Sequence, residues 1–251
     1  MVIITGSTGI GAAAARVAAA GGARLLVATS DEMSGWELAA ETGAECWTGD
    51  LRLPNAGDSV VAQCVARFGR VDGVFNVAGM SGRRFGDGPV HEVDDAGWEA
   101  AIEGNLTITF RMCRAAIGRM MVQAPGEDGS RGAIVNVSSV LVESPESQHF
   151  ATHAYAAAKG GVEALTRSMA AQYAPLGIRV NCVAPGLAGT PAGERTQADP
   201  AMAEFLRKKQ SLTGGVIAVE DIARAAMFLM GRSGRAITGE VLTIDGGWRF
   251  S

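Results

Sequence analysis

The sequence predicts an α/β protein built on one doubly wound parallel sheet, and three observations support this fold class. The chain has 251 residues, a length that suits one large α/β domain with a substantial core. Short runs rich in β-branched residues alternate with longer alanine-rich segments of helical period along the whole chain. Two of the short runs, residues 71–76 and 132–137, are apolar on both faces, as expected for central strands that helices cover on each side.

We expect seven strands joined through helices by right-handed crossovers, with ligands bound outside the carboxyl ends of the strands. The expected strands are residues 2–5, 24–29, 45–48, 71–76, 132–137, 178–183 and 240–244. The expected helices are residues 10–20, 55–68, 95–122, 153–174 and 219–231. Since no repeat, low-complexity tract or change of composition marks a boundary, residues 1–251 are predicted to form a single domain.

One irregular stretch, residues 186–215, interrupts this pattern. It contains Pro191, Pro200, two glycine clusters and the charged run Arg207-Lys208-Lys209. A long excursion inside a compact domain is usually functional, and we interpret this one as a substrate lid with some helix of its own. The alternative is a surface insertion without a role in the site.

Charge and cysteine content exclude several function classes. With 22 Lys and Arg against 26 Asp and Glu, the net charge is -4, so the chain offers no basic field for nucleic acid and a small-molecule partner is expected. The four cysteines form no CxxC pair, so neither a metal site nor a disulfide framework is predicted, and reduced, mostly buried thiols are expected. They are Cys46, Cys64, Cys113 and Cys182.

The chain also lacks the patterns of export or membrane insertion. The first apolar stretch, residues 1–5, is too short for a signal-peptide core. The most apolar helical segment, residues 12–20, contains Arg16 and ends at two glycines, well short of the roughly 20 residues that a membrane span needs. A cytoplasmic protein is therefore expected.

The first predicted strand runs directly into the glycine-rich segment Thr5-Gly-Ser-Thr-Gly-Ile-Gly11, and an alanine-rich helix follows. Glycines permit a tight turn and close approach of the backbone to a pyrophosphate, whose charge meets the free N–H groups of the helix N-terminus. An ordinary glycine turn is the alternative, but the position between strand and helix favours a dinucleotide cradle. Its predicted contact residues are Gly6, Ser7, Thr8, Gly9, Ile10 and Gly11.

Polar residues at the ends of the next strands offer further contacts to a dinucleotide. Asp50-Leu51 follows the third strand, where a carboxylate can accept from an adenine amino group and a backbone amide can serve the ring. Asn76-Val-Ala-Gly79 ends the fourth strand with a side-chain amide and a glycine that allows close approach. Each of these residues is equally compatible with a structural role at a strand end.

The end of the second strand bears on the choice between NAD and NADP. An acid there binds the adenosine ribose hydroxyls, whereas an arginine binds a 2′-phosphate. The residues are Thr29-Ser30-Asp31-Glu32, with Thr29 at the position where an acid is expected. Because no Lys or Arg lies in the glycine loop and two acids follow Ser30, we favour NAD and leave NADP open.

Tyr155 and Lys159 stand four residues apart in a predicted helix and therefore share one face. The chain has only two tyrosines and three lysines, so this spacing is improbable by chance. A phenol is a weak base at neutral pH, and a neighbouring ammonium, with the positive ring of an oxidised nicotinamide, favours the phenolate.

Two further polar residues can join this pair. Ser138 and Ser139 end the fifth strand, so a hydroxyl can meet Tyr155 and polarise a substrate oxygen, although serines after a strand are also common turn residues. Asn105, inside the predicted helix 95–122, is an amide that can hold water against Lys159. Asn is mildly unfavourable within a helix, which allows but does not require such a role.

Taken in order, these motifs resemble the short-chain dehydrogenase/reductase family, and the match extends to Thr238-Gly-Glu-Val-Leu-Thr-Ile-Asp-Gly-Gly247. The resemblance implies a seven-stranded Rossmann-type sheet, a catalytic set of Asn105, Ser139, Tyr155 and Lys159, and usually a homotetramer. It also implies cofactor contacts by Ala78, by Tyr155 and Lys159 themselves, and by Pro185, Gly186 and Thr190 in Pro185-Gly-Leu-Ala-Gly-Thr190.

Two departures from the family pattern accompany the resemblance. Ser139 precedes Tyr155 by 16 residues, a longer separation than usual, so residues 140–154 are expected to carry a small insertion and either serine remains a candidate. Asn76-Val replaces the commoner Asn-Asn pair, which we expect to matter little because Ala78-Gly79 is intact.

The predicted reaction is reversible hydride transfer between nicotinamide and a secondary alcohol or ketone. An NADPH-dependent 3-oxoacyl thioester reductase and a nucleotide-binding sensor without turnover are the alternatives. The pocket is expected to be apolar, lined by Met80, Leu141, Val142, Phe150 and Leu187. Arg83 and Arg84 can bind an anionic substrate, and His149 and His153 can adjust the polarity of the pocket, but a solvated surface position is the expectation for all four.

Overall fold

The computed structural model describes every residue except 192, 194, 195 and 197, and it places seven parallel strands in one sheet. The strand order is β3-β2-β1-β4-β5-β6-β7, which confirms the doubly wound sheet. Thr5, Asn76 and Asn136 stand side by side in register near the carboxyl ends of β1, β4 and β5. The strands are β1 Val2–Thr5, β2 Leu25–Thr29, β3 Glu45–Thr48, β4 Gly73–Asn76, β5 Gly132–Val137, β6 Ile178–Pro185 and β7 Val241–Ile244.

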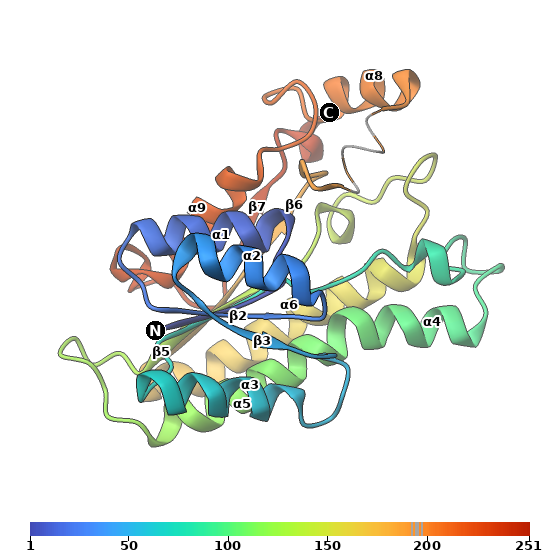
Figure 1. Ribbon diagram of the computed structural model, residues 1–251. Coiled ribbons are helices and arrows are strands. Elements are labelled where there is room, and N and C mark those ends of the chain that lie inside the picture. The colour runs from blue at the N-terminus through green and yellow to red at the C-terminus, as the bar shows by residue number, and fades with distance from the viewer. Residues whose placement is uncertain (192, 194–195, 197) are drawn as a thin grey trace.

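Helices cover both faces of this sheet (Figure 1). Helices α1, α2 and α9 lie on one face, and α3, α5 and α6 lie on the other. The helices are α1 Gly9–Ala20, α2 Glu32–Thr42, α3 Ala56–Phe68, α4 Asp95–Ile102, α5 Ile108–Val122, α6 His153–Tyr173, α8 Pro200–Lys209 and α9 Val219–Met230.

Successive residues of the central strands pack into two different cores, because side chains alternate between the faces of a sheet. Val74 of β4 belongs to the core beneath α3 and α5, and its neighbour Phe75 belongs to the core beneath α1 and α9. Ile134 and Val135 of β5 divide in the same way. These strands are therefore apolar on both faces, as the sequence predicts.

Helix α2 is absent from the elements predicted above, and this omission was wrong. Its apolar pattern is weak, since only Gly35 and Leu38 are buried. The local signals were nevertheless present: the Asp31 carboxylate caps the helix by accepting from Ser34 N at 3.3 Å, and Gly43 ends it in the left-handed region at φ 70°.

The predicted continuous α-helix over 95–122 also needs correction. A π-helical segment, Glu103–Thr107, separates α4 from α5 and contains Asn105. Smaller corrections concern the ends of strands: Val71 and Asp72 lie outside β4, and β6 continues two residues further to Pro185. The extension pairs Pro185 with Ile244 of β7.

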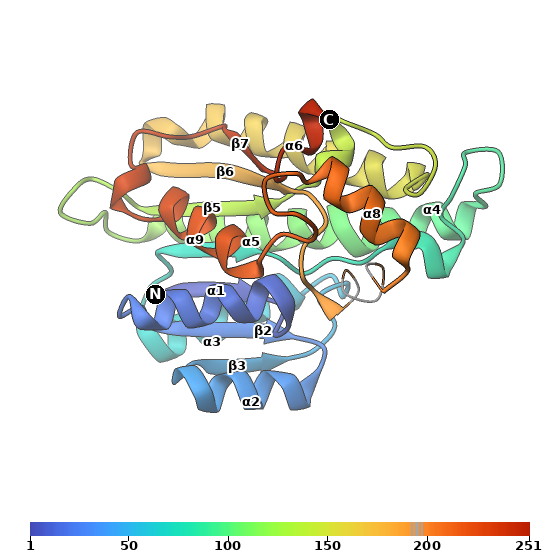
Figure 2. The same cartoon turned by 90° about the horizontal axis from the view of Figure 1, so that it is seen from above.

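The stretch 186–215 contains helix α8, as expected for a segment with some helix of its own. Asp199 caps α8 by accepting from Ala201 N at 3.0 Å, and Pro200 occupies the first helical turn. Leu206 of α8 is buried with Val140, which follows β5, and with Trp248 near the C-terminus. Figure 2 shows α8 beside the C-terminus, on the side of the molecule where the chain leads into α4.

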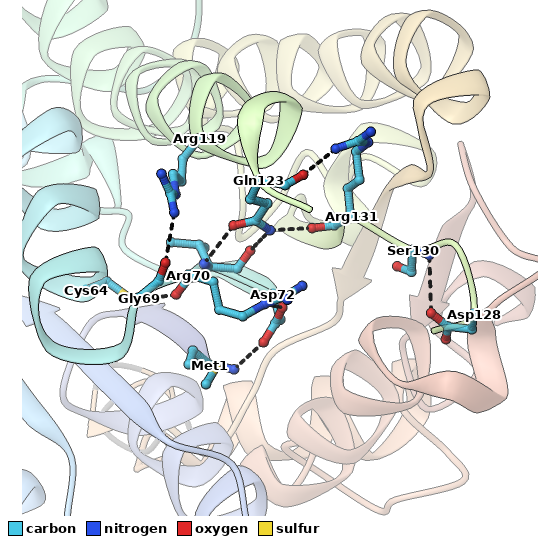
Figure 3. Close-up of polar contacts among 11 residues, drawn as sticks. Met1, Cys64, Gly69, Arg70, Asp72, Arg119, Gln123, Asp128, Ser130 and Arg131 are labelled. Atoms are coloured by element: carbon cyan, nitrogen blue, oxygen red, sulfur yellow. Dashed lines mark hydrogen bonds and ion pairs between the residues drawn. The ribbon is translucent and has the colours of Figure 1, made fainter. Parts of the chain in front are cut away.

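The amino-terminal edge of the sheet is held by a dense set of polar contacts (Figure 3). The buried Gln123 side chain accepts from Val71 N at 3.2 Å and donates to Val71 O at 2.7 Å and to Arg131 O at 2.6 Å. Gln123 follows α5, so these three hydrogen bonds fix the end of this helix to the chain that enters β4 and β5.

Candidate active site

The glycine-rich loop turns sharply between β1 and α1. Gly6 and Gly9 have positive φ angles of 94° and 52°, which favour glycine. A Cβ on Gly11 would lie 2.3 Å from Gly6 O, so only glycine fits there. Thr8, the N-cap of α1, makes no side-chain cap and no acid lies in the first turn. Gly11 N donates to Thr8 O at 3.1 Å, which leaves the N–H groups of Gly9 and Ile10 for an anion. These features fit a pyrophosphate.

Further contacts join this loop to other predicted segments. The Thr5 hydroxyl accepts from Val77 N and Ala78 N, each at 2.9 Å, and so fixes the chain after β4 beside the loop. A Cβ on Gly9 would lie 2.9 Å from Thr190 Cγ2, so the start of the 186–215 stretch also approaches the loop.

A cavity of about 280 Å³ opens beside the glycine loop and extends along the ends of β2, β3 and β4. It contains nine of the predicted cofactor contacts: Gly6, Ser7, Thr8, Thr29, Ser30, Asp50, Leu51, Ala78 and Gly79. It also contains residues that the sequence reasoning did not assign to the cofactor, namely Ala28, Asp31, Gly49, Arg52, Met80, Gly104 and Ile108.

Thr29 has its hydroxyl engaged within the protein. It is buried and bonds to Ser7 Oγ at 2.8 Å, and it accepts from Asp31 N at 3.1 Å. Ser7 Oγ also bonds to Ser34 Oγ at 2.7 Å, which joins the glycine loop to α2. The end of β2 therefore presents Ser30 and Asp31 as its polar groups to the cavity.

Asp50 carries an ionic partner that sequence reasoning missed. Arg52 Nη2 lies 2.8 Å from Asp50 Oδ2, and Arg52 Nε lies 3.0 Å from Oδ1. These hydrogen bonds lower the pKa of Asp50. The carboxylate expected to accept from adenine is thus already paired with a guanidinium that lines the same cavity.

Tyr155 and Lys159 lie next to each other in the first two turns of α6. Lys159 Nζ is 5.5 Å from the centroid of the Tyr155 ring and donates to Val137 O at 2.9 Å. Burial lowers the pKa of Lys159 to about 8 and raises the pKa of Tyr155 to about 12. A side-chain hydrogen bond with Ser139 acts in the opposite direction and lowers the pKa of Tyr155.

The two serines after β5 have different partners. Ser138 Oγ donates to Glu163 Oε1 at 2.8 Å and lies 3.2 Å from Lys159 O, so its hydroxyl faces the body of α6. Ser139 Oγ accepts from Leu141 N at 3.3 Å and bonds with the Tyr155 side chain. Ser139 is therefore the serine that meets the phenol.

Asn105 lies in the π-helical segment between α4 and α5 and is fully buried. Its amide accepts from Met80 N at 3.2 Å and donates to Met80 O at 3.0 Å. A Cβ on Gly79 would lie 2.8 Å from Asn105 Oδ1 and 3.4 Å from Lys159 Nζ. The absence of a side chain at Gly79 therefore lets Asn105 approach Lys159. Segments of π-helix are frequent at functional sites.

The Asn76 side chain is buried and lies outside the cavity lining, so its predicted contact with the cofactor stays a prediction. Its Nδ2 donates to Asn136 Oδ1 at 2.9 Å, and Asn136 in turn donates to Thr166 Oγ1 at 2.9 Å. This buried network connects β4, β5 and α6 beneath the site. Asn76 Oδ1 has no hydrogen-bond partner among the described residues.

Pro185 and Gly186 lie at the end of β6, outside the cavity. A Cβ on Gly186 would lie 2.3 Å from Gln210 Oε1. Gln210 follows α8 and is fully buried, and its side chain accepts from Leu187 N at 2.6 Å and donates to Gly215 O at 2.5 Å. Gln210, which the sequence reasoning overlooked, therefore fastens both ends of the 186–215 stretch. Ile10, Gly9, Gly11 and Thr190 are also outside the cavity lining.

An aromatic cluster joins α8 to residues 149–150 and to the C-terminal segment. Phe205 of α8 contacts His149 at 4.7 Å and Trp248 at 5.7 Å between ring centroids, and Phe150 lies 5.6 Å from Trp248. Arg83 donates to His149 O and lies over the Phe150 ring, while the residue itself is exposed, as expected for a surface position. Leu141, Phe150 and Leu187, all predicted pocket residues, pack into the same cluster.

Over the part of the chain that the structure describes, no group of His, Cys, Asp and Glu gathers in a way that could hold a metal ion, and no helix is long and apolar enough to cross a membrane. All four cysteines are free; Cys64, Cys113 and Cys182 are buried and Cys46 is half-buried, as expected from the sequence.

A family model described as enoyl-(acyl carrier protein) reductase matches residues 4–249. The chain belongs to the short-chain dehydrogenase/reductase family. This membership confirms the resemblance inferred from the motifs.

Within this family, the chain is similar to several dehydrogenases and reductases. It is 36% identical to an inactive 2-(S)-hydroxypropyl-CoM dehydrogenase 2 of Xanthobacter autotrophicus, over 93% of this chain and 98% of that protein. It is 33% identical to D-threitol dehydrogenase of Mycolicibacterium smegmatis, over 99% and 92%. A variant of actinorhodin polyketide ketoreductase with NADPH superposes with a TM-score of 0.86 at 27% identity, covering 100% of this chain and 97% of that one. The protein is an oxidoreductase of this family and uses a nicotinamide cofactor.

Proposed function

We propose that this short-chain dehydrogenase/reductase interconverts a secondary alcohol and a ketone, with Tyr155 as the general acid and base. The observation that carries the proposal is the contact of the Tyr155 ring with the buried Lys159 ammonium, beside Ser139. This contact lies at the carboxyl edge of the sheet, where the cavity also lies. The nicotinamide dinucleotide supplies the hydride acceptor or donor when bound. The glycine loop, the free N–H groups of α1 and Gly79 are the features that fit it.

In the oxidation direction, the Tyr155 phenolate takes the hydroxyl proton while the carbinol carbon gives up its hydride and its C–O bond becomes a carbonyl. Lys159 makes the phenolate accessible, because a cation beside the ring offsets part of the burial that raises the phenol's pKa to about 12. Ser139 donates to the substrate oxygen and orients it. Asn105, adjacent to Lys159 across Gly79, holds a water that returns protons to solvent.

The Lys159 ammonium has the free hydrogen-bond donors that this role requires. Its ammonium has three donors, and Val137 O is its sole hydrogen-bond acceptor among the described residues. The remaining donors are available to the ribose hydroxyls of the nicotinamide half of the cofactor. A buried ammonium with unmet donors is unfavourable for stability, which supports a functional reason for its position.

Replacing Tyr155 by Phe tests the proposal. The variant removes only the phenol oxygen, so turnover should fall by about 10²- to 10⁴-fold while the affinity for the dinucleotide stays near that of the parent. The matched control is Tyr173→Phe. It removes the phenol oxygen of the chain's other tyrosine, which lies at the opposite end of α6 from Tyr155. Parent-like turnover in Tyr155→Phe would reject Tyr155 as the acid and base.

For the cofactor, we propose a preference for NAD over NADP. The nucleotide cavity is lined by two carboxylates, Asp31 and Asp50, and by one guanidinium, Arg52, which Asp50 already engages. A 2′-phosphate would add a second anion near Asp31 without an unpaired cation in the cavity lining. Thr29, with its hydroxyl bonded to Ser7, gives the phosphate no charge either.

Fluorescence titration with NADH and NADPH measures this preference. Asp31→Asn is the informative variant, because Asn still caps α2 but carries no charge. The ratio of NADPH to NADH dissociation constants should fall in Asp31→Asn relative to the parent. Tighter binding of NADPH than NADH by the parent would overturn the preference.

For the substrate, we propose an apolar secondary alcohol or ketone, because Leu141, Phe150 and Leu187 pack with the aromatic cluster beside the site. A 3-oxoacyl thioester is the second candidate, because the matching family model is described as a reductase of enoyl-(acyl carrier protein), which is also an acyl thioester. A panel of alcohols, ketones and thioesters with both cofactors distinguishes them. Nucleotide binding without turnover on this panel would instead favour a sensor. A homotetramer stays a prediction, which light scattering tests.

A further inference from the structure

The loop between β4 and α4 lies against the N-terminus of α6, the helix that carries Tyr155. The Asp87 carboxylate of this loop is buried, with 7% of the residue exposed. Its Oδ1 accepts from Ala154 N at 2.9 Å, and its Oδ2 accepts from Tyr155 N at 3.0 Å. The neighbouring Gly88 O accepts from His153 N at 3.3 Å.

These contacts replace the usual local cap of a helix. Thr152, the N-cap of α6, makes no side-chain cap hydrogen bond, and the first turn has no acid. The first three N–H groups of α6 are instead satisfied by a segment more than sixty residues earlier in the chain. Asp87 therefore holds the backbone of Tyr155 itself, in addition to stabilising the helix end.

Asp87 is held firmly in turn. Its own N–H donates to Gly82 O at 3.1 Å, and Gly82 leaves the space that the carboxylate fills, since a Cβ there would lie 2.6 Å from Asp87 Cβ. The chain leading to Gly82 begins at Met80, whose backbone makes both hydrogen bonds with Asn105. One short segment thus contacts the backbone of Tyr155 at one end and the amide of Asn105 at the other.

We infer that Asp87 is a positioning residue for the reaction: it fixes the position of the Tyr155 phenol relative to Lys159 and Asn105. This inference rests on the proposed role of Tyr155. A displacement of about 1 Å in a reacting group can slow a reaction about a hundredfold, so a small shift of the first turn of α6 is sufficient for a kinetic effect. Asp87 is not among the residues that line the nucleotide cavity.

The test compares Asp87→Ala and Asp87→Asn with Asp94→Ala. Asp94 is the control because it caps α4 by accepting from Gly97 N at 2.7 Å and makes no hydrogen bond to α6 among the described residues. Each cap should contribute about 1 kcal/mol to stability, so both alanine variants should lower the melting temperature. Only the Asp87 variants should lower kcat, by about tenfold or more, with little change in the dissociation constant for the dinucleotide.

A second readout does not depend on turnover. Because the chain has only two tyrosines, tyrosine labelled with ¹³C at the ζ carbon gives two resonances, which Tyr155→Phe assigns. The Tyr155 resonance should shift in Asp87→Asn, which keeps one acceptor oxygen and the volume of the side chain, and stay in place in Asp94→Ala. Asp87→Asn also allows the test to be made if Asp87→Ala does not fold.

Two outcomes would overturn the inference: kcat of the Asp87 variants within about threefold of the parent, or losses of kcat that follow the melting temperature equally in the Asp87 and Asp94 variants. Either outcome counts against the inference when the parent is active and Tyr155→Phe is inactive. Activity of Tyr155→Phe would instead mean that the proposed function has failed, so the two failures can be told apart.

Discussion

At the amino-terminal edge of the sheet, the buried Gln123 amide makes three hydrogen bonds with backbone groups of residues 71 and 131 (Figure 3). At the carboxyl edge, the buried Lys159 ammonium bonds one carbonyl, and Asn76 Oδ1 bonds none among the described residues. Each edge leaves a buried side-chain atom without a hydrogen-bond partner among the described residues, Arg119 Nε at the first and Asn76 Oδ1 at the second, so the contrast depends on Lys159, whose ammonium has three donors and one acceptor. Polar capacity left over at one edge indicates where a ligand completes the structure.

The glycines differ between the two regions in the same way. Around the glycine loop, a Cβ on Gly11 or Gly9 would meet neighbouring atoms within 3 Å. On the outer surface of α5, a Cβ on Gly118 would meet nothing within 4 Å. Gly9 and Gly11 therefore permit a tight backbone turn in which no side chain fits, whereas Gly118 lies at an open helical position where a side chain fits.

The largest expected effect comes from Lys159→Met, which removes the ammonium and keeps a long apolar side chain. Turnover should fall by about 10²- to 10⁴-fold, because the Tyr155 phenolate loses the adjacent cation. The free energy of unfolding should rise at neutral pH, because the buried charge is removed. Steady-state kinetics and urea denaturation of the same preparations measure the two changes, and a variant that loses both activity and stability would contradict this prediction.

The pH dependence of stability sharpens the same prediction. Burial lowers the pKa of Lys159 from 10.5 to about 8, so the unfolded chain binds more protons than the folded one between these values. Lys159 should therefore add stability to the parent relative to Lys159→Met, on the order of 3 kcal/mol at most, as the pH rises through this range. The buried thiols of Cys64, Cys113 and Cys182, whose pKa values burial raises, lower the stability of both proteins over the same range, so only the difference between the two proteins reports Lys159. Lys159→Met should lack that gain; equal slopes in parent and variant would show that Lys159 is not the titrating group.

Gly11→Ala should show the next largest effect. The new Cβ would lie 2.3 Å from Gly6 O, so the glycine loop must move. Overpacking of this kind destabilises the native arrangement by about 1–3 kcal/mol. Dinucleotide affinity should fall by about 5- to 150-fold, as measured by fluorescence titration. Gly118→Ala is the control: at an open helical site, alanine should stabilise the protein by about 0.5–1 kcal/mol without changing affinity. Parent-like affinity in Gly11→Ala would remove the glycine loop from the binding site.

The parts of the site that the sequence predicted depend on spacing within one element. Tyr155 and Lys159 share a face because four residues span about one helical turn, and the glycine loop follows from its place between a strand and a helix. Short runs with apolar residues on both faces likewise identified the central strands of the sheet. These patterns are local, so they can be read without knowing the tertiary structure.

The parts that the sequence did not predict depend on contacts between distant segments. Asp87 reaches α6 only because the fold brings residues 82–88 beside its first turn. Asn76 turns toward Asn136 because parallel register places the two side by side. Helix α2 was missed for a different reason, since one buried leucine gives no amphipathic period.

The smallest of these effects is expected at the amino-terminal edge, from Gln123→Leu. The variant keeps an apolar side chain of similar size but leaves Val71 N, Val71 O and Arg131 O without their side-chain partner. Unfolding free energy should fall by about 1–3 kcal/mol, with kcat and dinucleotide affinity unchanged. Thermal denaturation and the kinetic assay measure both quantities. A loss of kcat at unchanged stability would show that the two edges are coupled, and the contrast between a structural and a ligand-binding edge would then be wrong.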